Sequence, residues 1–247
     1  FSALVSTYES IKYIIDFNSQ NEHSLADFRL SYFGYPITLA EIKMLILLMM
    51  FPFILSKENF IFNKWLLIAL SAPVLLSLYF TNTRNAILGL FFGVLIIGIL
   101  KNRYFLISFI AAVILFLYFA PVRFTERIIS IVEISHPSNV ARFRMWETGL
   151  KMIKDSPVTG YGDVNIPALY KKYKEPESHG EGSHMHNNFM HITVLYGIPG
   201  LIIWLALIIY IMIKQFKAYN KVKSDELLNI IVISSISCMF AFIISGL

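Results

Sequence analysis

Histidine and amide side chains gather at the point where a polar segment gives way to a long apolar one. The segment HMHNNFMHITVLYGIPG, residues 184–200, holds His186 and Asn187 just before the apolar run. A membrane-spanning helix does not require histidine or amide groups at its N-terminal end, so polar groups at this position indicate a functional site. The positive end of a helix disfavours imidazolium, which leaves His186 neutral and able to accept a proton. The pattern therefore predicts a general base at His186.

Two other interpretations of these histidines stay open. They can be polar residues at the membrane interface whose ring nitrogens are satisfied by loop backbone. They can also bind a metal, because four of them fall within thirteen positions: His179, His184, His186 and His191. The spacing H-x4-H-x-H-x4-H is not typical of zinc sites. We therefore expect no metal and no other cofactor.

Arg84, in the turn TNTRN at residues 81–85, stands directly before another apolar run. A cation at a helix N-terminus is electrostatically unfavourable until an anion arrives there. Backbone N–H groups, the hydroxyls of Thr81 and Thr83, and the guanidinium together would form a phosphate site. The alternative is an arginine that anchors the helix at the membrane interface.

Another candidate cation lies in the segment VARFRMWETGLKMIKD, residues 140–155. The apolar residues of this segment repeat with a helical period, at Phe143, Trp146, Leu150 and Ile153. The pattern predicts an amphipathic helix lying at the membrane interface. Arg142 precedes Trp146 by one turn and shares its face, whereas Arg144 points elsewhere. A solvated helix charge is the alternative interpretation of Arg142.

The composition places these residues in a membrane protein. Hydrophobic residues make up 56% of the 247 residues and charged residues only 15%, which is more apolar and less charged than a soluble domain. The net charge of +5 lies largely in short loops between apolar runs, so it indicates topology rather than a nucleic-acid partner. The single Cys238 excludes an intrachain disulfide. Because the chain opens without Met and stops in apolar sequence, we expect a fragment of a longer protein.

Six apolar stretches are long enough to cross a bilayer. They must be helices, because lipid offers no partner to open backbone groups and the stretches lack the alternation of barrel strands. The expected fold is an all-α, polytopic transmembrane helical bundle with a large extracytoplasmic loop that contains interfacial amphipathic helices. The spans are predicted at Ile37–Leu55, Phe60–Phe80, Asn85–Leu100, Tyr104–Ala120, Asn188–Ile213 and Leu227–Leu247.

Lysine and arginine in the short loops orient these spans. Lys57, Lys101 and Lys221 lie in loops on one side of the membrane, which is therefore predicted to be cytoplasmic. Arg84, Arg142 and His186 then share the opposite side, together with Arg29. The chain is predicted to comprise an extracytoplasmic segment that can be the end of a missing span, four transmembrane helices, a large extracytoplasmic loop and two further transmembrane helices, at residues 1–36, 37–120, 121–187 and 188–247.

Three segments together resemble the O-antigen ligase and polymerase superfamily of bacterial membrane glycosyltransferases. HNNFMHITVLYGIPG is similar to the family motif H-N-x9-G-x-x-G that follows the large loop. TNTRNAILGL resembles the turn with an Arg before a span, and SNVARFRMWETGLKMIKDSPVTGYG resembles the R-x3-W…D-x-P-x-x-G-x-G stretch. The segments occur in the family's order between residues 82 and 200. The functional Arg of the second pattern stands four before the Trp, which selects Arg142 over Arg144.

The resemblance implies a metal-independent, inverting transfer at the periplasmic face of the bacterial inner membrane. The implied donor is a glycan linked through a diphosphate to undecaprenol, and the implied acceptor is a sugar hydroxyl on lipid A-core or on another lipid-linked glycan. Arg84 and Arg142 would hold the diphosphate and His186 would take the proton of the attacking hydroxyl. Asn187, His184 and Arg29 are expected to contact substrate. We favour the ligase reaction, with lipid A-core as acceptor.

Three alternatives to an O-antigen ligase remain. A polysaccharide polymerase of the same superfamily would use the same chemistry on a different acceptor. A lipid-linked sugar transporter would carry charges deep within its spans, but the predicted spans are nearly free of charge at their centres, with Glu41 and Lys43 close to the outer end of the first. A non-catalytic membrane scaffold would lose only stability when Arg84, Arg142 or His186 is replaced.

Overall fold

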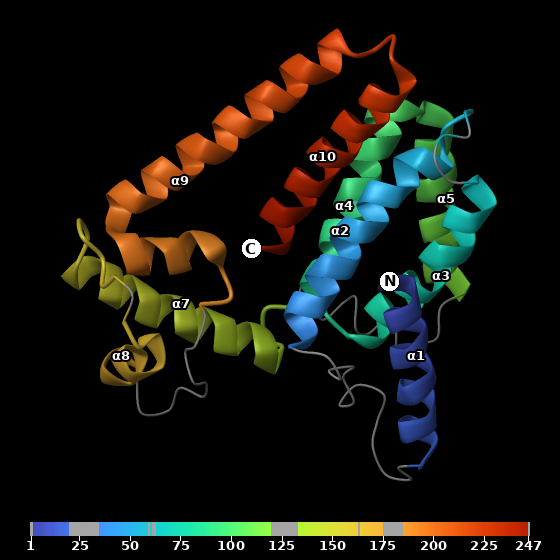
Figure 1. Ribbon diagram of the computed structural model, residues 1–247. Coiled ribbons are helices and arrows are strands. Elements are labelled where there is room, and N and C mark those ends of the chain that lie inside the picture. Colours follow the sequence, from blue (N-terminus) through green and yellow to red (C-terminus); the bar gives the residue numbers. More distant parts are fainter. Residues whose placement is uncertain are drawn as a thin grey trace. The chain divides into compact units, whose positions relative to one another are not determined.

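The computed structural model describes residues 2–19, 35–58, 60, 63–119, 133–162, 164–174 and 185–246 (Figure 1). Every regular element within these residues is an α-helix, which confirms the predicted all-α class. The chain forms two compact units. The first, the bundle, comprises residues 1–113 and 214–245, and the second, the loop unit, comprises residues 114–213 and 246–247.

Apolar packing through small residues holds the bundle together. α2 (Pro36–Ile54) contacts α3 (Lys64–Phe80), α4 (Arg84–Lys101) and α10 (Glu226–Ser245), and α10 also packs on α4. A Cβ atom on Gly89 would lie 2.5 Å from Met44 Sδ, and one on Gly93 would lie 2.6 Å from Leu48 Cδ1. These glycines allow α4 to approach α2 closely, as small residues do between membrane helices.

The six predicted spans coincide with six helices of the structure. Four helices are long and apolar enough to cross a membrane, namely α2, α4, α10 and α9 (Asn188–Lys221). α3 and α5 (Arg103–Phe119) are shorter apolar helices. α3 begins at Lys64, later than predicted, because the Asn63 side chain accepts a hydrogen bond from Trp65 N at 3.0 Å and caps the helix there.

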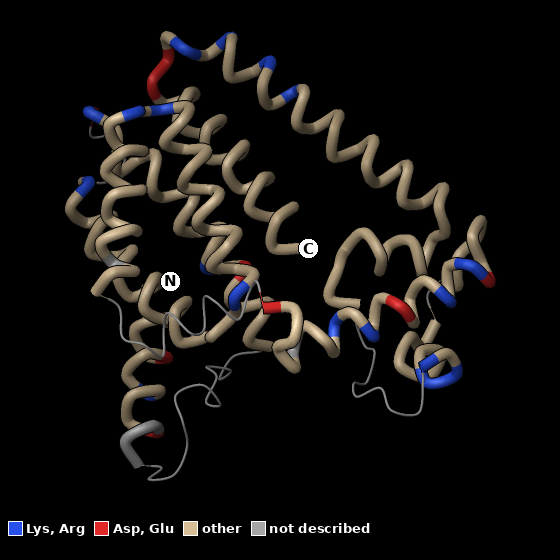
Figure 2. Tube along the Cα trace, turned by 180° about the vertical axis from the view of Figure 1, so that it is seen from behind, with Lys and Arg blue, Asp and Glu red and all other residues tan. Residues whose placement is uncertain are grey.

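Basic side chains mark one end of the bundle. Lys and Arg residues cluster at the end where α9 connects to α10 (Figures 1 and 2). Lys101, at the end of α4, forms an ion pair of 2.6 Å with Glu226, the first residue of α10. This is the end predicted to be cytoplasmic, and the orientation of the bundle stays a prediction.

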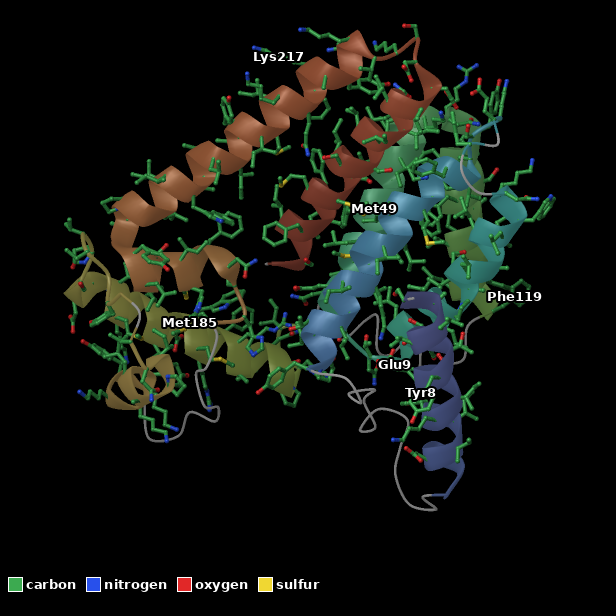
Figure 3. The ribbon with its side chains drawn as sticks, viewed as in Figure 1. Tyr8, Glu9, Met49, Phe119, Met185 and Lys217 are labelled. Atoms are coloured by element: carbon green, nitrogen blue, oxygen red, sulfur yellow. The ribbon has the colours of Figure 1, made fainter. Side chains whose placement is uncertain are left out.

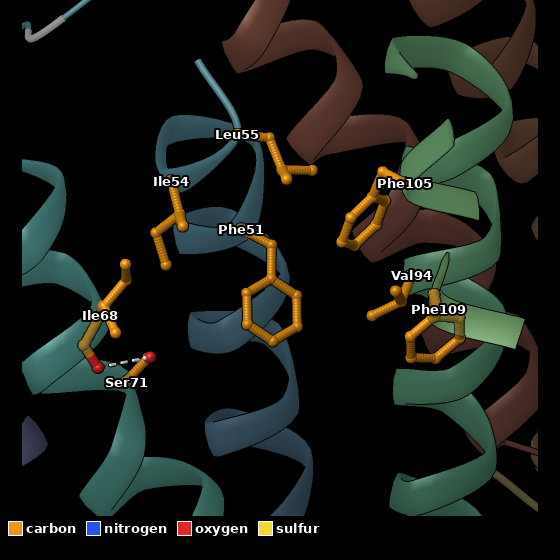
Figure 4. Close-up of a pocket in the computed structure, with 8 residues that line it drawn as sticks. All are labelled: Phe51, Ile54, Leu55, Ile68, Ser71, Val94, Phe105 and Phe109. Atoms are coloured by element: carbon orange, nitrogen blue, oxygen red, sulfur yellow. Dashed lines mark hydrogen bonds between the residues drawn. The ribbon is translucent and has the colours of Figure 1, made fainter. Parts of the chain in front are cut away.

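An apolar pocket opens among α2, α3, α4 and α5 (Figure 4). Its wall includes the rings of Phe51, Phe105 and Phe109 together with Val94. Ser71 is its polar member, and that hydroxyl donates to the backbone carbonyl of Ile68 at 2.8 Å. The pocket therefore offers hydrocarbon surroundings and no polar group to recognise a headgroup.

The segment predicted as extracytoplasmic, residues 1–36, begins with a helix. α1 (Ser2–Ser19) packs on α3, and the ring of Tyr13 stacks on Phe80 with a centroid separation of 4.3 Å. Glu9 of α1 is fully buried, which the sequence pattern did not indicate.

The loop unit is built around two helices of the predicted loop and the first part of α9. α7 (Pro137–Asp155) confirms the predicted amphipathic helix, and α8 (Ile166–Tyr173) packs against it. Met145 and Met152 are the buried hydrophobic residues of α7, whereas Phe143 and Leu150 of the predicted apolar face are exposed. The apolar side chains of Phe143 and Leu150 remain available to an interface with lipid.

Candidate functional site

His186 stands at a constrained position before α9. Its φ of 49° lies in the left-handed region, which a non-glycine residue adopts rarely and which is frequent at functional sites. The next residue, Asn187, caps the helix, since its Oδ1 accepts a hydrogen bond from Met190 N at 3.0 Å. The half-buried His186 side chain is therefore presented at the positive end of a helix.

Trp146 of α7 fixes the backbone next to His186. Its indole Nε1 donates to the carbonyl oxygen of Met185 at 3.0 Å, and the Met185 side chain is fully buried (Figure 3). A Cβ atom on Gly149 would lie 2.6 Å from Met190 Sδ, so α7 approaches the start of α9 closely. The tryptophan of the R-x3-W pattern thus has a direct structural role in positioning the histidine segment.

Arg142 lies on α7 one turn before Trp146, where the same face of the helix runs toward Met185. Its side chain is half-buried, whereas that of Arg144 is exposed. The two arginines therefore differ in exposure, and the choice of Arg142 as the functional one stays a prediction. Arg142 is within one helical turn of the contact that fixes the backbone before His186.

The stretch after α7 is hydrogen-bonded to a bend in α9. Tyr161 N donates to Val194 O at 3.0 Å, and Gly162 N donates to Leu195 O at 2.7 Å. In return, Ile198 N donates to Pro157 O at 2.8 Å. The segments that carry the D-x-P-x-x-G-x-G and H-N-x9-G-x-x-G patterns are thus joined by backbone hydrogen bonds. We call this contact the backbone junction.

Two glycines with positive φ make this junction possible. Gly160 has a φ of 63° and Gly197 a φ of 69°. A Cβ atom on Gly160 would overlap Leu195 O, and one on Gly197 would overlap Val158 O. The bend in α9 is therefore at Gly197, and the predicted span Asn188–Ile213 consists of two helical parts.

A polar chain joins α7 to α8. Tyr173 donates its hydroxyl to Asp155 Oδ2 at 2.7 Å and accepts a hydrogen bond of the same length from Tyr161. The hydrogen bonds with Tyr161 and, second, with Asp155 raise the pKa of Tyr173 above its usual range. The aspartate of the D-x-P pattern thus helps hold α8 in place. Asn165 followed by Ile-Pro is typical of a helix start, so this signal could have predicted α8.

Arg84 is the first residue of α4, in the bundle, and its side chain is half-buried. The preceding hydroxyls differ from the prediction, because Thr81 donates to Leu78 O at 2.6 Å and Thr83 donates to Thr81 O at 3.3 Å. Both threonines are buried and their protons satisfy backbone carbonyls. Asn82, with a φ of 57°, completes the turn. The predicted phosphate site therefore keeps the Arg84 guanidinium and the backbone N–H groups at the start of α4, but it does not have these two hydroxyls as donors.

The model of one protein family, described as O-antigen ligase, matches residues 65–205, which is more than half of the chain. The chain belongs to the O-antigen ligase family. The matched region contains Arg84, Arg142 and His186. A search of curated proteins found no match.

Membership of the O-antigen ligase family and the apolar helices together identify a multi-pass membrane protein of the ligase or polymerase type, a glycosyltransferase-like enzyme. Within it, the loop unit brings the Arg142 helix and the His186 segment together. Arg84 belongs to the bundle, and its place beside the other two stays a prediction. His184 and Arg29 lie outside the described residues. Among the residues that the structure describes, no group of three His, Cys, Asp or Glu side chains could hold a metal.

Proposed function

We propose that the protein transfers a glycan from undecaprenyl diphosphate to a sugar hydroxyl of lipid A-core, at the periplasmic face of the inner membrane. The observation that carries the proposal is the hydrogen bond from Trp146 to Met185, which joins the helix of Arg142 to the segment of His186 inside the region matched by the O-antigen ligase family. This contact supports a single site that uses an arginine and a histidine from distant parts of the sequence.

His186 is the general base of the proposed reaction. Transfer with inversion requires the acceptor hydroxyl to attack the anomeric carbon from the side opposite the diphosphate, and the hydroxyl must lose its proton as the new bond forms. The positive end of α9 disfavours protonation of the imidazole, so the ring stays able to accept that proton. The cap at Asn187 and the fixed carbonyl of Met185 hold the ring's backbone in place.

Arg142 and Arg84 bind the diphosphate and stabilise the charge that develops on it when the glycosidic bond breaks. A guanidinium is always charged and forms paired hydrogen bonds with phosphate oxygens, so two arginines can supply the stabilisation without a metal ion. His184, Asn187 and Arg29 are proposed to contact the glycan or phosphate. Asn187 can use its amide N–H groups, because its Oδ1 caps α9.

The hydrocarbon tail of the donor would lie along the apolar surface of the bundle. Val94, in the wall of the apolar pocket, is ten residues after Arg84 on α4, or about 15 Å along the helix. A polyprenyl chain held by its diphosphate near Arg84 is long enough to reach that pocket. The aromatic and aliphatic lining suits an isoprenoid chain and excludes its polar headgroup.

The test is a transfer assay with purified full-length protein and a radiolabelled glycan on undecaprenyl diphosphate. One reaction contains lipid A-core as acceptor, and the other contains a second lipid-linked glycan. The proposal predicts labelled lipid A-core and an unchanged rate in EDTA. Extension of the lipid-linked glycan alone would identify a polymerase, and no transfer to either acceptor would contradict the proposal.

A further inference from the structure

Helix α1 has its polar face inside and its apolar face outside. Ser6, Glu9, Ser10 and Tyr13 recur at helical spacing and are all buried. The exposed stripe is apolar and comprises Leu4, Tyr8, Ile11, Ile14 and Ile15. Tyr8 is 54% exposed although the adjacent Glu9 is fully buried (Figure 3). This order is the reverse of a helix on a soluble protein and is typical of a helix with apolar surroundings.

A buried ion pair attaches α1 to its neighbours. Glu9 Oε2 lies 2.7 Å from Lys43 Nζ of α2, and the two side chains are 0% and 5% exposed. Ser77 of α3 donates its hydroxyl to the same carboxylate oxygen at 2.8 Å. Because apolar surroundings provide no hydrophobic force between helices, these polar contacts hold α1 in place together with its packing on α3.

The cluster is costly to maintain. Glu9 Oε1 and the hydroxyls of Ser6 and Ser10 are buried without a hydrogen-bond partner. An unsatisfied buried polar group costs about 1–3 kcal/mol, and a buried ion pair often adds less stability than apolar residues of the same volume. Stability alone therefore does not account for Glu9 and Lys43.

The cluster supports the turn that carries Arg84. Ser77 and Phe80 belong to the last turn of α3, where Glu9 and Tyr13 of α1 contact them. Thr81 N donates to Ser77 O at 3.2 Å, so the residue that binds Glu9 is also hydrogen-bonded to the first residue of the turn. Four residues after Phe80 the chain reaches Arg84.

We propose that Glu9 and Lys43 are positioning residues that hold the end of α3, and through it the Arg84 turn, in the geometry that binds diphosphate. This inference rests on the proposed function, in which Arg84 binds the donor. Neither residue contacts substrate, and both lie outside the region that the family matches.

The opposite end of α4 provides a matched control. There Lys101 and Glu226 form an ion pair of 2.6 Å, and Ser56 donates its hydroxyl to the same Glu226 oxygen at 3.0 Å. The two clusters share their composition of Lys, Glu and Ser, but the second is far from Arg84 along the helix and more exposed. Glu226→Gln therefore removes a comparable ion pair without affecting the Arg84 turn.

The first experiment is a double-mutant cycle in the transfer assay with full-length protein. Glu9→Gln is expected to lower kcat/KM by about 10- to 100-fold, chiefly by raising KM for the lipid-linked donor, as a misplaced binding group does. In an Arg84→Ala background Glu9→Gln should cause no further loss. The charge swap Glu9→Lys with Lys43→Glu should restore much of the activity, and Glu226→Gln should leave it unchanged. An equal loss from Glu9→Gln in both backgrounds would overturn the proposal.

The second experiment does not depend on activity. A nitroxide label at Tyr79→Cys, in a Cys238→Ser background, reports the mobility of the last turn of α3, where Tyr79 is 50% exposed. Glu9→Gln should increase this mobility, and Glu226→Gln should not. An identical spectrum in all three proteins would overturn the positioning role. Full activity of Arg84→Ala would instead show that Arg84 does not bind the donor, which would contradict the proposed function. In that case the label still tests whether Glu9 and Lys43 hold the end of α3.

Discussion

Gly93 of the bundle and the pair Gly160 and Gly197 of the loop unit have different structural roles. In α4 of the bundle, the three atoms nearest to a Cβ atom on Gly93 all belong to the side chain of Leu48, which can move when a methyl group is added. In the loop unit, Gly160 and Gly197 have positive φ and face backbone carbonyls, which cannot move without breaking hydrogen bonds. A methyl group can therefore be accommodated at Gly93, whereas Gly160 and Gly197 fix the backbone around the candidate site.

Apart from His186, the largest effect on activity is expected at Arg142. Arg142→Ala should lower the transfer rate by about 10²- to 10³-fold, because it removes a charge that stabilises the departing diphosphate. Arg144→Ala is the matched control, since it removes the same charge two residues away from an exposed position. Initial rates at saturating donor distinguish the two. Equal losses in both variants would mean that general charge on α7, and not Arg142, is responsible.

Gly197→Ala should have the next largest effect. Alanine at this φ is strained and its Cβ would overlap Val158 O, so we expect a loss of about 3 kcal/mol in the free energy of unfolding together with most of the activity. Thermal unfolding in detergent provides the measurement. Gly162→Ala is the control, because Gly162 has a similar φ but no atom within 4 Å of its Cβ position, and it should cost only about 1 kcal/mol. Similar losses in the two variants would show that the contact with Val158 O does not cause the loss of stability in Gly197→Ala.

The sequence predicted the bundle better than the loop unit. Hydropathy and helical period are local properties, so the spans and α7 could be placed from the residues themselves. The bend at Gly197 depends on carbonyls of residues 157 and 158, and the buried face of Glu9 depends on Lys43 and Ser77 of other helices. Arg142 was selected by its spacing to Trp146. The hydrogen bond of Trp146 with Met185 is a tertiary contact, which no local sequence pattern can predict.

Trp146→Phe should have an intermediate effect. Phenylalanine keeps most of the ring but removes the Nε1–H donor, which leaves the carbonyl of buried Met185 without this hydrogen bond. We expect a stability loss of about 1 kcal/mol and a drop of roughly tenfold in transfer rate, because the segment before His186 is less well fixed. Circular dichroism melts and initial rates measure the two effects. A rate equal to that of the native protein would show that this bond does not position the histidine.

The smallest effect is expected in the bundle. Gly93→Ala places a methyl group against the terminal carbons of Leu48, whose side chain can adopt another rotamer. We expect a change below about 1 kcal/mol in stability and less than a twofold change in transfer rate. The same melts and rates apply. A loss as large as that of Gly197→Ala would contradict the distinction between the two kinds of glycine.

The most direct test of the account is the single-turnover rate of glycan transfer by His186→Ala, measured with full-length protein whose melting temperature equals that of the native form. If His186 takes the proton of the acceptor hydroxyl, the rate should fall by about 10²- to 10⁴-fold while the affinity for the lipid-linked donor changes little. Transfer at the native rate by the folded variant would contradict the central claim.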